Sequence, residues 1–285
     1  MGVRGRTVVA AEWGRQSDMT DLGGTSDVVA FAGDWQGPVV ATSVHAGHGL
    51  RPEIADAMVL DEDTRLREED PFTDRIAAVV PDRAITSRSR FEADLNRPRR
   101  EAVYRRPEDC WGLDVWRGGT LSRELFEGSL ATYDAFYDAL APRLDALAER
   151  GPFVLLDVHS YNHRRDGADA DPAPAEDNPE VNVGTASIDR QTFGPLVERF
   201  VTDIRAGGTG CGPVDARENV SFEGRALAWF VHDRYPGVGC VLALEFKKVW
   251  MDEWTAEVDE ERLSCVRAAL AATLPGLHEE LEKLR

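Results

Sequence analysis

Short apolar runs alternate with longer amphipathic segments along this chain of 285 residues, which is the pattern of an α/β layered fold. Compact apolar runs predict strands, and apolar side chains that recur at steps of three and four predict helices. The predicted strands cover residues 39–44, 84–87, 91–95, 153–158 and 238–246. The predicted helices cover residues 53–59, 71–80, 121–150, 191–205, 224–235 and 257–284.

Two prolines interrupt the strongest helical patterns. Pro142 lies inside the 121–150 segment and predicts either a kink or two separate helices, while Pro275 predicts an interruption of the last helix. The apolar run at 153–158 is continuous rather than alternating, so we expect a central strand that is covered on both faces.

Composition narrows the class of protein. The cysteines at positions 110, 211, 240 and 265 form no Cys-x-x-Cys pair, which predicts small buried thiols in a reducing, cytoplasmic compartment and argues against a cysteine-bound zinc. The net charge of −18 predicts repulsion from nucleic acids and anionic membranes, so neither is an expected partner. Residues 1–26 are polar and glycine-rich and predict a flexible leader, with residues 27–285 forming a single domain.

Histidines follow two of the predicted strands. His45 and His48 come after the strand at 39–44, and His159 comes after the strand at 153–158. Imidazoles brought together at the carboxyl edge of a sheet predict a site for a divalent metal ion. Asp157 is two residues before His159 and shares its face of the strand, so it could support that ligand.

Three further side chains each have a functional and a structural interpretation. Glu245 lies inside an apolar strand, where it could be the general base for a metal-activated water or could pair with Lys247 at an exposed strand end. Asn96 and Arg97 begin a loop before Pro98, where they could bind a substrate carboxylate or form an ordinary turn. The residues alone do not decide between the functional and the structural interpretation of Glu245, or between those of Asn96 and Arg97.

Four segments carry these candidate residues in a specific order and spacing. They are Val44-His45-Ala46-Gly47, Arg90-Phe91-Glu92-Ala93-Asp94-Leu95-Asn96-Arg97, Asp157-Val158-His159-Ser160 and Leu244-Glu245-Phe246. Together they resemble the N-formylglutamate amidohydrolase family, from about residue 38 to about residue 254. That family is similar to zinc carboxypeptidases, so the resemblance implies a three-layer α/β/α fold around a mixed, mostly parallel sheet.

The resemblance also implies one zinc ion per chain, with His45 and His159 as ligands. Carboxypeptidase-like proteins have a glutamate three residues after the first histidine, and this chain has His48 at that position. We therefore expect His48 as the third ligand, with Asp70 as the second choice and Glu53 as the third.

The implied reaction is hydrolysis of a small molecule, N-formyl-L-glutamate, to formate and glutamate, as in histidine catabolism. In this reaction Glu245 would be the general base, Arg90 would stabilise the oxyanion, and Asn96 with Arg97 would bind the substrate carboxylate. Ala46 departs from the Pro-His-Ser-Gly pattern of the family. The alternatives are therefore a zinc deacylase or carboxypeptidase for another N-acyl amino acid or short peptide, and a catalytically silent metal- or anion-binding protein on the same scaffold.

Overall fold

The computed structural model describes residues 27–285, and the predicted leader at 1–26 lies outside the described residues. The strands are β1 (Val29–Ala32), β2 (Val39–Ser43), β3 (Arg83–Thr86), β4 (Phe153–Tyr161), β5 (Val181–Gly184), β6 (Ala216–Glu218) and β7 (Gly239–Lys247). They form one seven-stranded sheet in the order β1-β3-β2-β4-β7-β5-β6. Only the β1–β3 and β5–β7 pairs are antiparallel, so the sheet is mixed and mostly parallel, as predicted.

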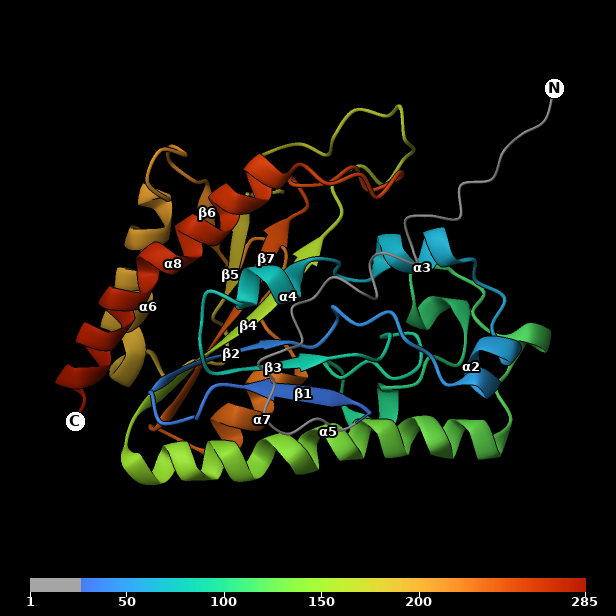
Figure 1. Cartoon of the computed structure of the whole chain (residues 1–285), viewed down its shortest axis with the longest axis horizontal. Coiled ribbons are helices and arrows are strands. Elements are labelled where there is room, and N and C mark those ends of the chain that lie inside the picture. The colour runs from blue at the N-terminus through green and yellow to red at the C-terminus, as the bar shows by residue number, and fades with distance from the viewer. Residues whose placement is uncertain (1–26) are drawn as a thin grey trace.

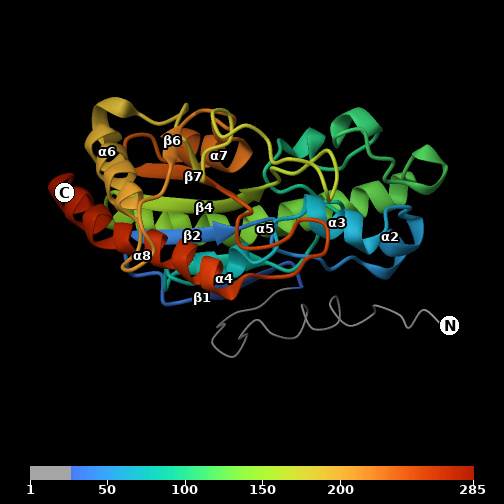
Figure 2. The ribbon, with the colours of Figure 1, turned by 90° about the horizontal axis from the view of Figure 1, so that it is seen from above.

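Helices cover both faces of this sheet and give the three predicted layers (Figures 1 and 2). The α-helices are α2 (Pro52–Ala57), α3 (Glu62–Glu68), α4 (Thr73–Ala77), α5 (Arg123–Arg150), α6 (Arg190–Ala206), α7 (Ala226–Arg234) and α8 (Glu260–Lys283). Helices α5 and α7 pack on one face, and α4, α6 and α8 pack on the other. Among the described residues, none of the helices is both long enough and apolar enough to cross a bilayer.

Strand β4 is buried along its whole length, which confirms the predicted central strand at 153–158. Phe153 and Leu155 belong to the apolar cluster under α5 and α7, whereas Val154 and Leu156 belong to the cluster under α6 and α8. Successive side chains of a strand point to opposite faces, so both faces require apolar residues. The strand continues to Tyr161, and His159 therefore lies inside the sheet rather than after it.

Helices α5 and α8 each continue through an internal proline. The predicted interruption at Pro275 and the alternative of two helices around Pro142 are therefore wrong. A proline removes one helical hydrogen bond and crowds the preceding turn. In α5, the fully buried Leu140 and Leu144 flank Pro142 and hold both halves of the helix against the sheet.

Residues 91–95 form turns, and the predicted strand there is wrong. All five side chains are buried, so the alternation of apolar and polar residues does not separate a buried face from an exposed one. Glu92 accepts a hydrogen bond from Arg51 Nε at 2.7 Å, and Asp94 N donates to Ala102 O at 2.7 Å. The short elements β1, β5, β6 and α3 were not predicted from the sequence. Apart from 91–95, the bounds of every predicted strand and helix lie within three residues of the observed bounds.

Cys211 and Cys265 form a disulfide, which corrects the prediction of four buried, reduced thiols. Their Cα atoms are 5.5 Å apart, although the two residues are separated by 54 positions in the sequence. Gly208 lets the loop after α6 approach α8 closely, because a Cβ at this position would lie 2.5 Å from the Cβ of Ala268. Cys110 and Cys240 are buried free thiols, as predicted.

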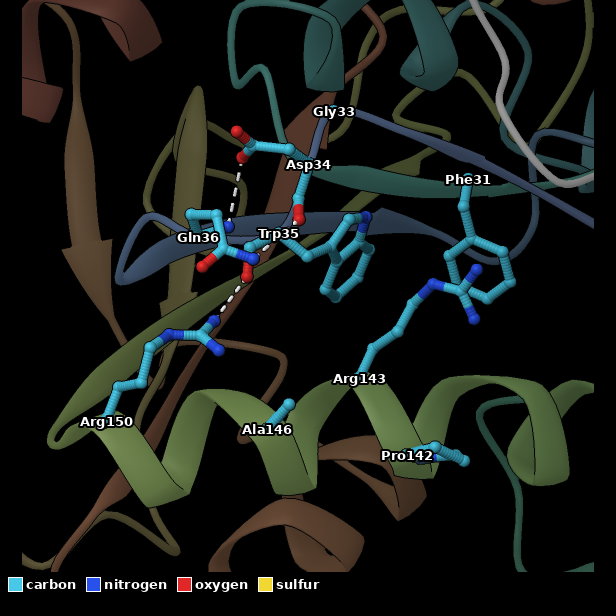
Figure 3. Close-up of a pocket in the computed structure, with 9 residues that line it drawn as sticks. All are labelled: Phe31, Gly33, Asp34, Trp35, Gln36, Pro142, Arg143, Ala146 and Arg150. Carbon is cyan, nitrogen blue, oxygen red and sulfur yellow. Dashed lines mark hydrogen bonds between the residues drawn. The ribbon is translucent and has the colours of Figure 1, made fainter.

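A cavity of about 290 Å³ separates the β1–β2 turn from α5 (Figure 3). The Arg143 guanidinium packs on the Phe31 ring, with Cζ 3.6 Å from the ring centroid. Arg150 donates a hydrogen bond to the carbonyl oxygen of Trp35. These contacts fasten the turn to α5 at the amino end of β2, whereas His45 follows the carboxyl end of the same strand.

Candidate metal centre

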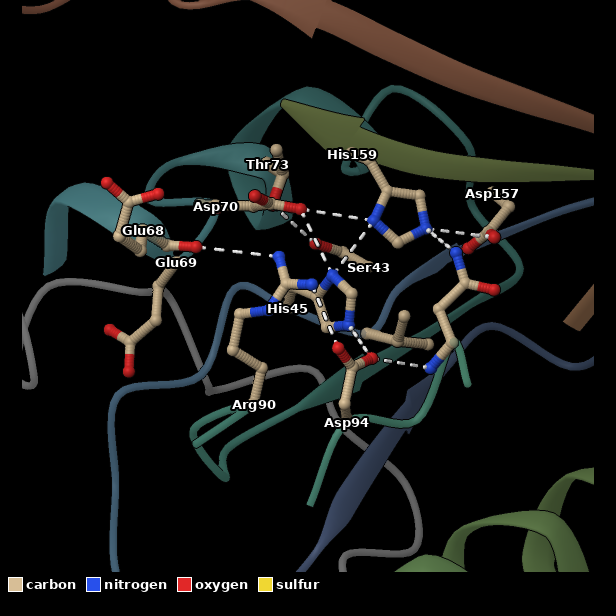
Figure 4. A network of polar contacts seen from close by, with 12 residues as sticks. Ser43, His45, Glu68, Glu69, Asp70, Thr73, Arg90, Asp94, Asp157 and His159 are labelled. Atoms are coloured by element: carbon tan, nitrogen blue, oxygen red, sulfur yellow. Dashed lines mark hydrogen bonds and ion pairs between the residues drawn. The ribbon is translucent and has the colours of Figure 1, made fainter. Parts of the chain in front are cut away.

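Three side chains of the types that bind metals meet near the carboxyl ends of β2 and β4 (Figure 4). His45 follows β2, His159 lies in β4, and Asp70 lies between α3 and α4. Each is at most 3% exposed. The two histidine Nδ1 atoms are 3.1 Å apart, and Asp70 Oδ2 lies 3.1 Å from His159 Nδ1 and 3.4 Å from His45 Nδ1. These atoms form a small buried triangle, which we call the metal-ligand triangle.

The donor types and the spacing of this triangle fit a divalent metal ion. Four-coordinate zinc, for example, binds imidazole nitrogen and carboxylate oxygen at about 2.0–2.2 Å, which places neighbouring ligand atoms roughly 3.3–3.6 Å apart. The observed separations of 3.1–3.4 Å are close to that range. Three protein ligands also leave a position for water or substrate, as catalytic sites require.

Carboxylates hold the outer nitrogen of each histidine. His45 Nε2 donates to Asp94 Oδ1 at 2.7 Å, and His159 Nε2 donates to Asp157 Oδ2 at 2.9 Å. When a metal ion takes the place of the Nδ1 protons, a proton on each Nε2 would leave the Nδ1 lone pair directed into the triangle, and such partners orient metal-binding histidines. The contact expected between Asp157 and His159 is therefore present, and Thr42 Oγ1 donates to the other Asp157 oxygen at 2.8 Å.

The electrostatics of the triangle favour bound positive charge. Burial opposes the charged form of Asp70, but hydrogen bonds from His159 and His45 outweigh it and hold the pKa of Asp70 far below its usual range. Burial also opposes imidazolium at His159, yet the Asp157 carboxylate raises the pKa of His159 well above its usual value. A proton and a metal cation therefore compete for the same nitrogen atoms.

Backbone contacts bring Asp70 to the histidines. Asp70 N donates to His45 O at 3.0 Å, so the peptides that carry two of the three side chains are bonded to each other. Asp70 O accepts from Thr73 Oγ1 at 2.6 Å, and this hydroxyl lies 2.7 Å from Ser43 Oγ at the end of β2. The position of Asp70 is thus fixed by its backbone on both sides.

His48 lies outside the metal-ligand triangle. Its Nδ1 atom is 2.5 Å from Glu69 Oε2, and its Nε2 atom is 2.8 Å from Arg65 Nη2. The structure therefore favours Asp70, the second choice from the sequence, over His48 as the third ligand.

The backbone explains why the spacing from His45 to His48 was misleading. Side chains three residues apart share a face in a helix. Here the chain follows a neighbouring segment instead, with a β-bridge between Gly49 and Arg88. Gly47 permits this contact, because a Cβ there would lie 2.5 Å from Arg88 O. Glu53, the third choice, is exposed on α2 and accepts a hydrogen bond from Arg51 Nη1 at 3.0 Å.

Glu245 lies beside the triangle on β7, as the register partner of His159. Partners on neighbouring parallel strands point to the same face, so the half-buried carboxylate and the imidazole face the same side of the sheet. Burial raises the pKa of Glu245 to about 8, against the opposing effect of His159. The alternative pairing with Lys247 is not observed, because Lys247 Nζ donates to Asn178 O at 2.6 Å.

Arg90 is connected to the triangle through Asp94. Its Nη2 atom donates to Asp94 Oδ2 at 2.9 Å, and its Nε atom donates to Tyr104 Oη at 3.3 Å. The Trp111 ring covers the guanidinium, with Cζ 4.9 Å from the ring centroid. Since the other oxygen of Asp94 holds His45, one carboxylate positions both the candidate ligand and the arginine.

Asn96 and Arg97 occupy different surroundings. The Asn96 side chain is buried between α7 and the triangle, where Oδ1 accepts from Leu227 N at 3.2 Å and Nδ2 lies 3.0 Å from His159 Nε2. Arg97 packs on Tyr104, with Cζ 4.9 Å from the ring centroid, and its Nε atom lies 3.4 Å from Asp94 Oδ2. Their joint role in binding a substrate carboxylate stays a prediction.

A comparison with protein families tests whether the chain belongs to the family that its four segments resemble. The sequence profile of N-formylglutamate amidohydrolase matches residues 37–248. The chain belongs to this family. The matched region contains His45, Asp70, His159 and Glu245, so the triangle and the neighbouring carboxylate lie within the part of the chain that matches the family.

Solved structures share the fold. The N-formylglutamate amidohydrolase from Ralstonia eutropha JMP134 matches with a TM-score of 0.70 and 17% identity, over 90% of this chain and 99% of that chain. The gene product Atu2144 from Agrobacterium tumefaciens matches with a TM-score of 0.58 and 15% identity, over 91% of this chain and 95% of that chain. At these identities the similarity shows the fold alone. No curated protein matches the chain.

Asp94 has a structural role that the sequence analysis did not assign. Its two oxygens accept from His45 Nε2, Asn96 N, Arg90 Nη2 and Tyr104 Oη at 2.5–3.0 Å. Burial disfavours its charge, but Arg90 and His45 hold the pKa of Asp94 well below the usual range. The signal was its place in the second of the four segments that resemble the N-formylglutamate amidohydrolase family.

Proposed function

We propose that this protein is a zinc-dependent hydrolase that cleaves the amide bond of N-formyl-L-glutamate to give formate and glutamate. The observation that carries the proposal is the buried metal-ligand triangle with Glu245 beside it on the neighbouring strand. Membership of the N-formylglutamate amidohydrolase family supports hydrolysis of an amide of this kind.

A zinc ion held by His45, Asp70 and His159 would polarise the formyl oxygen and lower the pKa of a water molecule from about 16 toward about 7. The positive charge of the zinc ion would favour the ionised form of Glu245, and this carboxylate accepts the proton of the attacking water as the water oxygen adds to the formyl carbon. The C–N bond then breaks, and Glu245 donates this proton to the departing amine nitrogen. The second proton of the water passes from the formic acid to the amine, so formate keeps the oxygen of the water, glutamate leaves with an ammonium group, and the Glu245 carboxylate is restored.

Two arginines supply positive charge for the substrate in this proposal. Arg90 is fixed by Asp94 and Tyr104 and would stabilise the oxyanion, an effect worth on the order of 3 kcal/mol for one oriented donor. Arg97 and Asn96 would bind a substrate carboxylate and hold the scissile amide in place. In a protein of net charge −18, such a local cationic site would select an anionic small molecule.

A different N-acyl amino acid is the second candidate substrate. One observation favours it: Ala46 stands where the pattern resembling the family has serine, next to the candidate ligand His45. A changed side chain at this place would alter the surroundings of the acyl group while leaving the triangle intact. The cytoplasmic location and the place in histidine catabolism stay predictions.

Parallel assays of N-formylglutamate, N-acetylglutamate and N-formylmethionine test the proposal, together with metal analysis of the purified protein. We expect about one zinc per chain, loss of activity on chelation, and the highest kcat/KM for N-formylglutamate. Preference for another compound would support the second candidate. Bound zinc without turnover of any of them would support a silent metal-binding protein.

A further inference from the structure

Lys248 places a positive charge in the interior directly after β7. It is 1% exposed, and its ammonium donates to Arg67 O at 2.7 Å, to Glu69 O at 2.7 Å and to Asn162 Oδ1 at 2.8 Å. An ammonium group has three protons, so each of them is used. All three acceptors are neutral, and no ion pair with Lys248 occurs among residues 27–285. A buried charge without a direct counter-ion is costly and calls for a specific role.

The three hydrogen bonds of Lys248 join the segments that carry the candidate site. Glu69 immediately precedes Asp70, Asn162 is three residues after His159, and Lys248 itself is three residues after Glu245. The same ammonium therefore connects the segment of the third ligand with the ends of the two central strands.

Two additional bonds close this connection. Asn162 Nδ2 donates to Arg67 O at 2.9 Å, so the amide and the ammonium share one acceptor. Lys248 N donates to Tyr161 O at 3.1 Å, beyond the last register pair of β4 and β7. The backbone at residues 67–69 is thus hydrogen-bonded to Asn162 and Lys248, which directly follow the strands that carry His159 and Glu245.

We propose that Lys248 is a positioning residue that sets Asp70 against His45 and His159 and thereby sets the affinity of the protein for its metal ion. The proposal rests on the proposed function, in which these three side chains bind zinc.

The peptide between Glu69 and Asp70 is the physical link. Its carbonyl oxygen accepts from Lys248 Nζ, and its N–H donates to His45 O at 3.0 Å. Both polar atoms of this one peptide are therefore fixed, which sets the direction in which the Asp70 side chain leaves the backbone. Hydrogen bonds from a charged donor are about twice as strong as neutral ones, which favours lysine over a neutral donor at this place.

Lys248→Met tests the proposal, because it keeps an unbranched apolar side chain and removes the ammonium. The zinc dissociation constant is measured by competition with a chelator, and circular dichroism checks that the metal-free variant is folded. We expect the constant to rise about 10- to 100-fold, as for other residues that orient metal ligands. The visible absorption bands of the cobalt-loaded protein should also shift, because they respond to the geometry of the Asp70 ligand.

Lys247→Met is the matched control. It removes the same charge from the adjacent residue, where Nζ donates to a single carbonyl oxygen, that of Asn178. We expect its zinc dissociation constant to stay within about twofold of the wild-type value, since the Lys247 ammonium contacts none of the segments that carry His45, Asp70 and His159. A folded Lys248→Met variant with unchanged zinc affinity and an unchanged cobalt spectrum overturns the proposal.

Asn162→Ala tests the positioning role of Lys248 if the Lys248→Met variant does not fold. It removes one acceptor of the ammonium and the bond to Arg67 O, and it should weaken zinc binding at least about threefold. An unchanged affinity in this variant overturns the positioning role. Wild-type protein that binds no zinc would refute the proposed function instead, so the two failures are distinguishable.

Discussion

His159 and Glu245 are register partners on the parallel strands β4 and β7. The two strands pair continuously from Phe153 and Gly239 to Tyr161 and Lys247, so the relative height of the two side chains is set by the sheet and not by loops. A slip of one residue would move Glu245 to the opposite face. The candidate ligand and the candidate base thus lie on rigid elements, as precise positioning of reacting groups requires.

Glu245→Gln should retain zinc and lose most of the turnover. The amide has nearly the shape of the carboxylate, but it cannot accept a proton and return it, so kcat should fall by about 10²- to 10⁴-fold. Steady-state kinetics and metal analysis of the same preparation check this. Near-normal turnover by the zinc-loaded variant would remove Glu245 as the base.

Asp70→Ala should weaken zinc binding far more than His48→Ala. Asp70 Oδ2 completes the triangle, whereas the His48 ring contacts Glu69 and Arg65. We expect the zinc dissociation constant to rise more than about 100-fold for Asp70→Ala, beyond the range of residues that only orient ligands, and to stay within about threefold for His48→Ala. The reverse order of the two effects would restore His48 as the third ligand.

Much of the candidate site could be predicted because its residues lie at the ends of apolar runs. The continuous run before His159 predicted a buried central strand, and the run before His45 predicted the strand beside it. Glu245 was conspicuous as a carboxylate inside an apolar run. These signals are local: an apolar run marks a buried strand, and the alternation of side chains along the strand determines the face to which each one points.

Asp70, the candidate third ligand, could not be predicted in this way. Asp70 reaches the triangle through a backbone bond to His45 O, and a contact between distant segments leaves no periodic pattern in the sequence. The Cys211–Cys265 disulfide is a contact of the same kind. At 91–95 the prediction failed because partners such as Arg51 hold buried carboxylates, so polar residues there do not mark solvent.

Asp94→Asn should weaken zinc binding by about 10- to 100-fold. The amide is neutral and a weaker acceptor for His45 Nε2, and it also loosens Arg90. Chelator competition measures the affinity. Asp134→Asn, which breaks an exposed pair with Arg99, is the control and should have no effect. Equal affinities for Asp94→Asn and the wild type would mean that Asp94 does not orient the ligand.

Arg97→Ala should raise KM for N-formylglutamate by about 10- to 100-fold, the range expected for loss of a hydrogen bond to a charged group. The KM for the uncharged diamide of the same substrate should change little, because it has no carboxylate to bind. Arg99→Ala controls for loss of a surface guanidinium, since Arg99 is exposed and pairs with Asp134. Equal increases of KM for both substrates would contradict the carboxylate-binding role.

Glu245 should make the metal-free protein less stable as the pH rises. Burial raises its pKa in the folded protein to about 8, from an ordinary value of 4.5. Between these two values the folded protein holds a proton that the unfolded chain has released. The folded state therefore binds more protons, and the free energy of unfolding decreases as the pH increases through this window.

Glu245→Gln has no proton to lose, so this contribution disappears. In chelator-treated protein, the Tm of the variant minus that of the wild type should increase from about pH 5 to about pH 8 and then stay constant. Glu260→Gln is the control: a hydrogen bond from Arg75 outweighs the opposing effect of burial and lowers the pKa of Glu260, so this carboxylate is already ionised throughout that range, and its partner Arg75 does not titrate there. The Tm difference of the control should therefore be independent of pH. The same independence in Glu245→Gln would show that Glu245 titrates at its ordinary pKa in the folded protein.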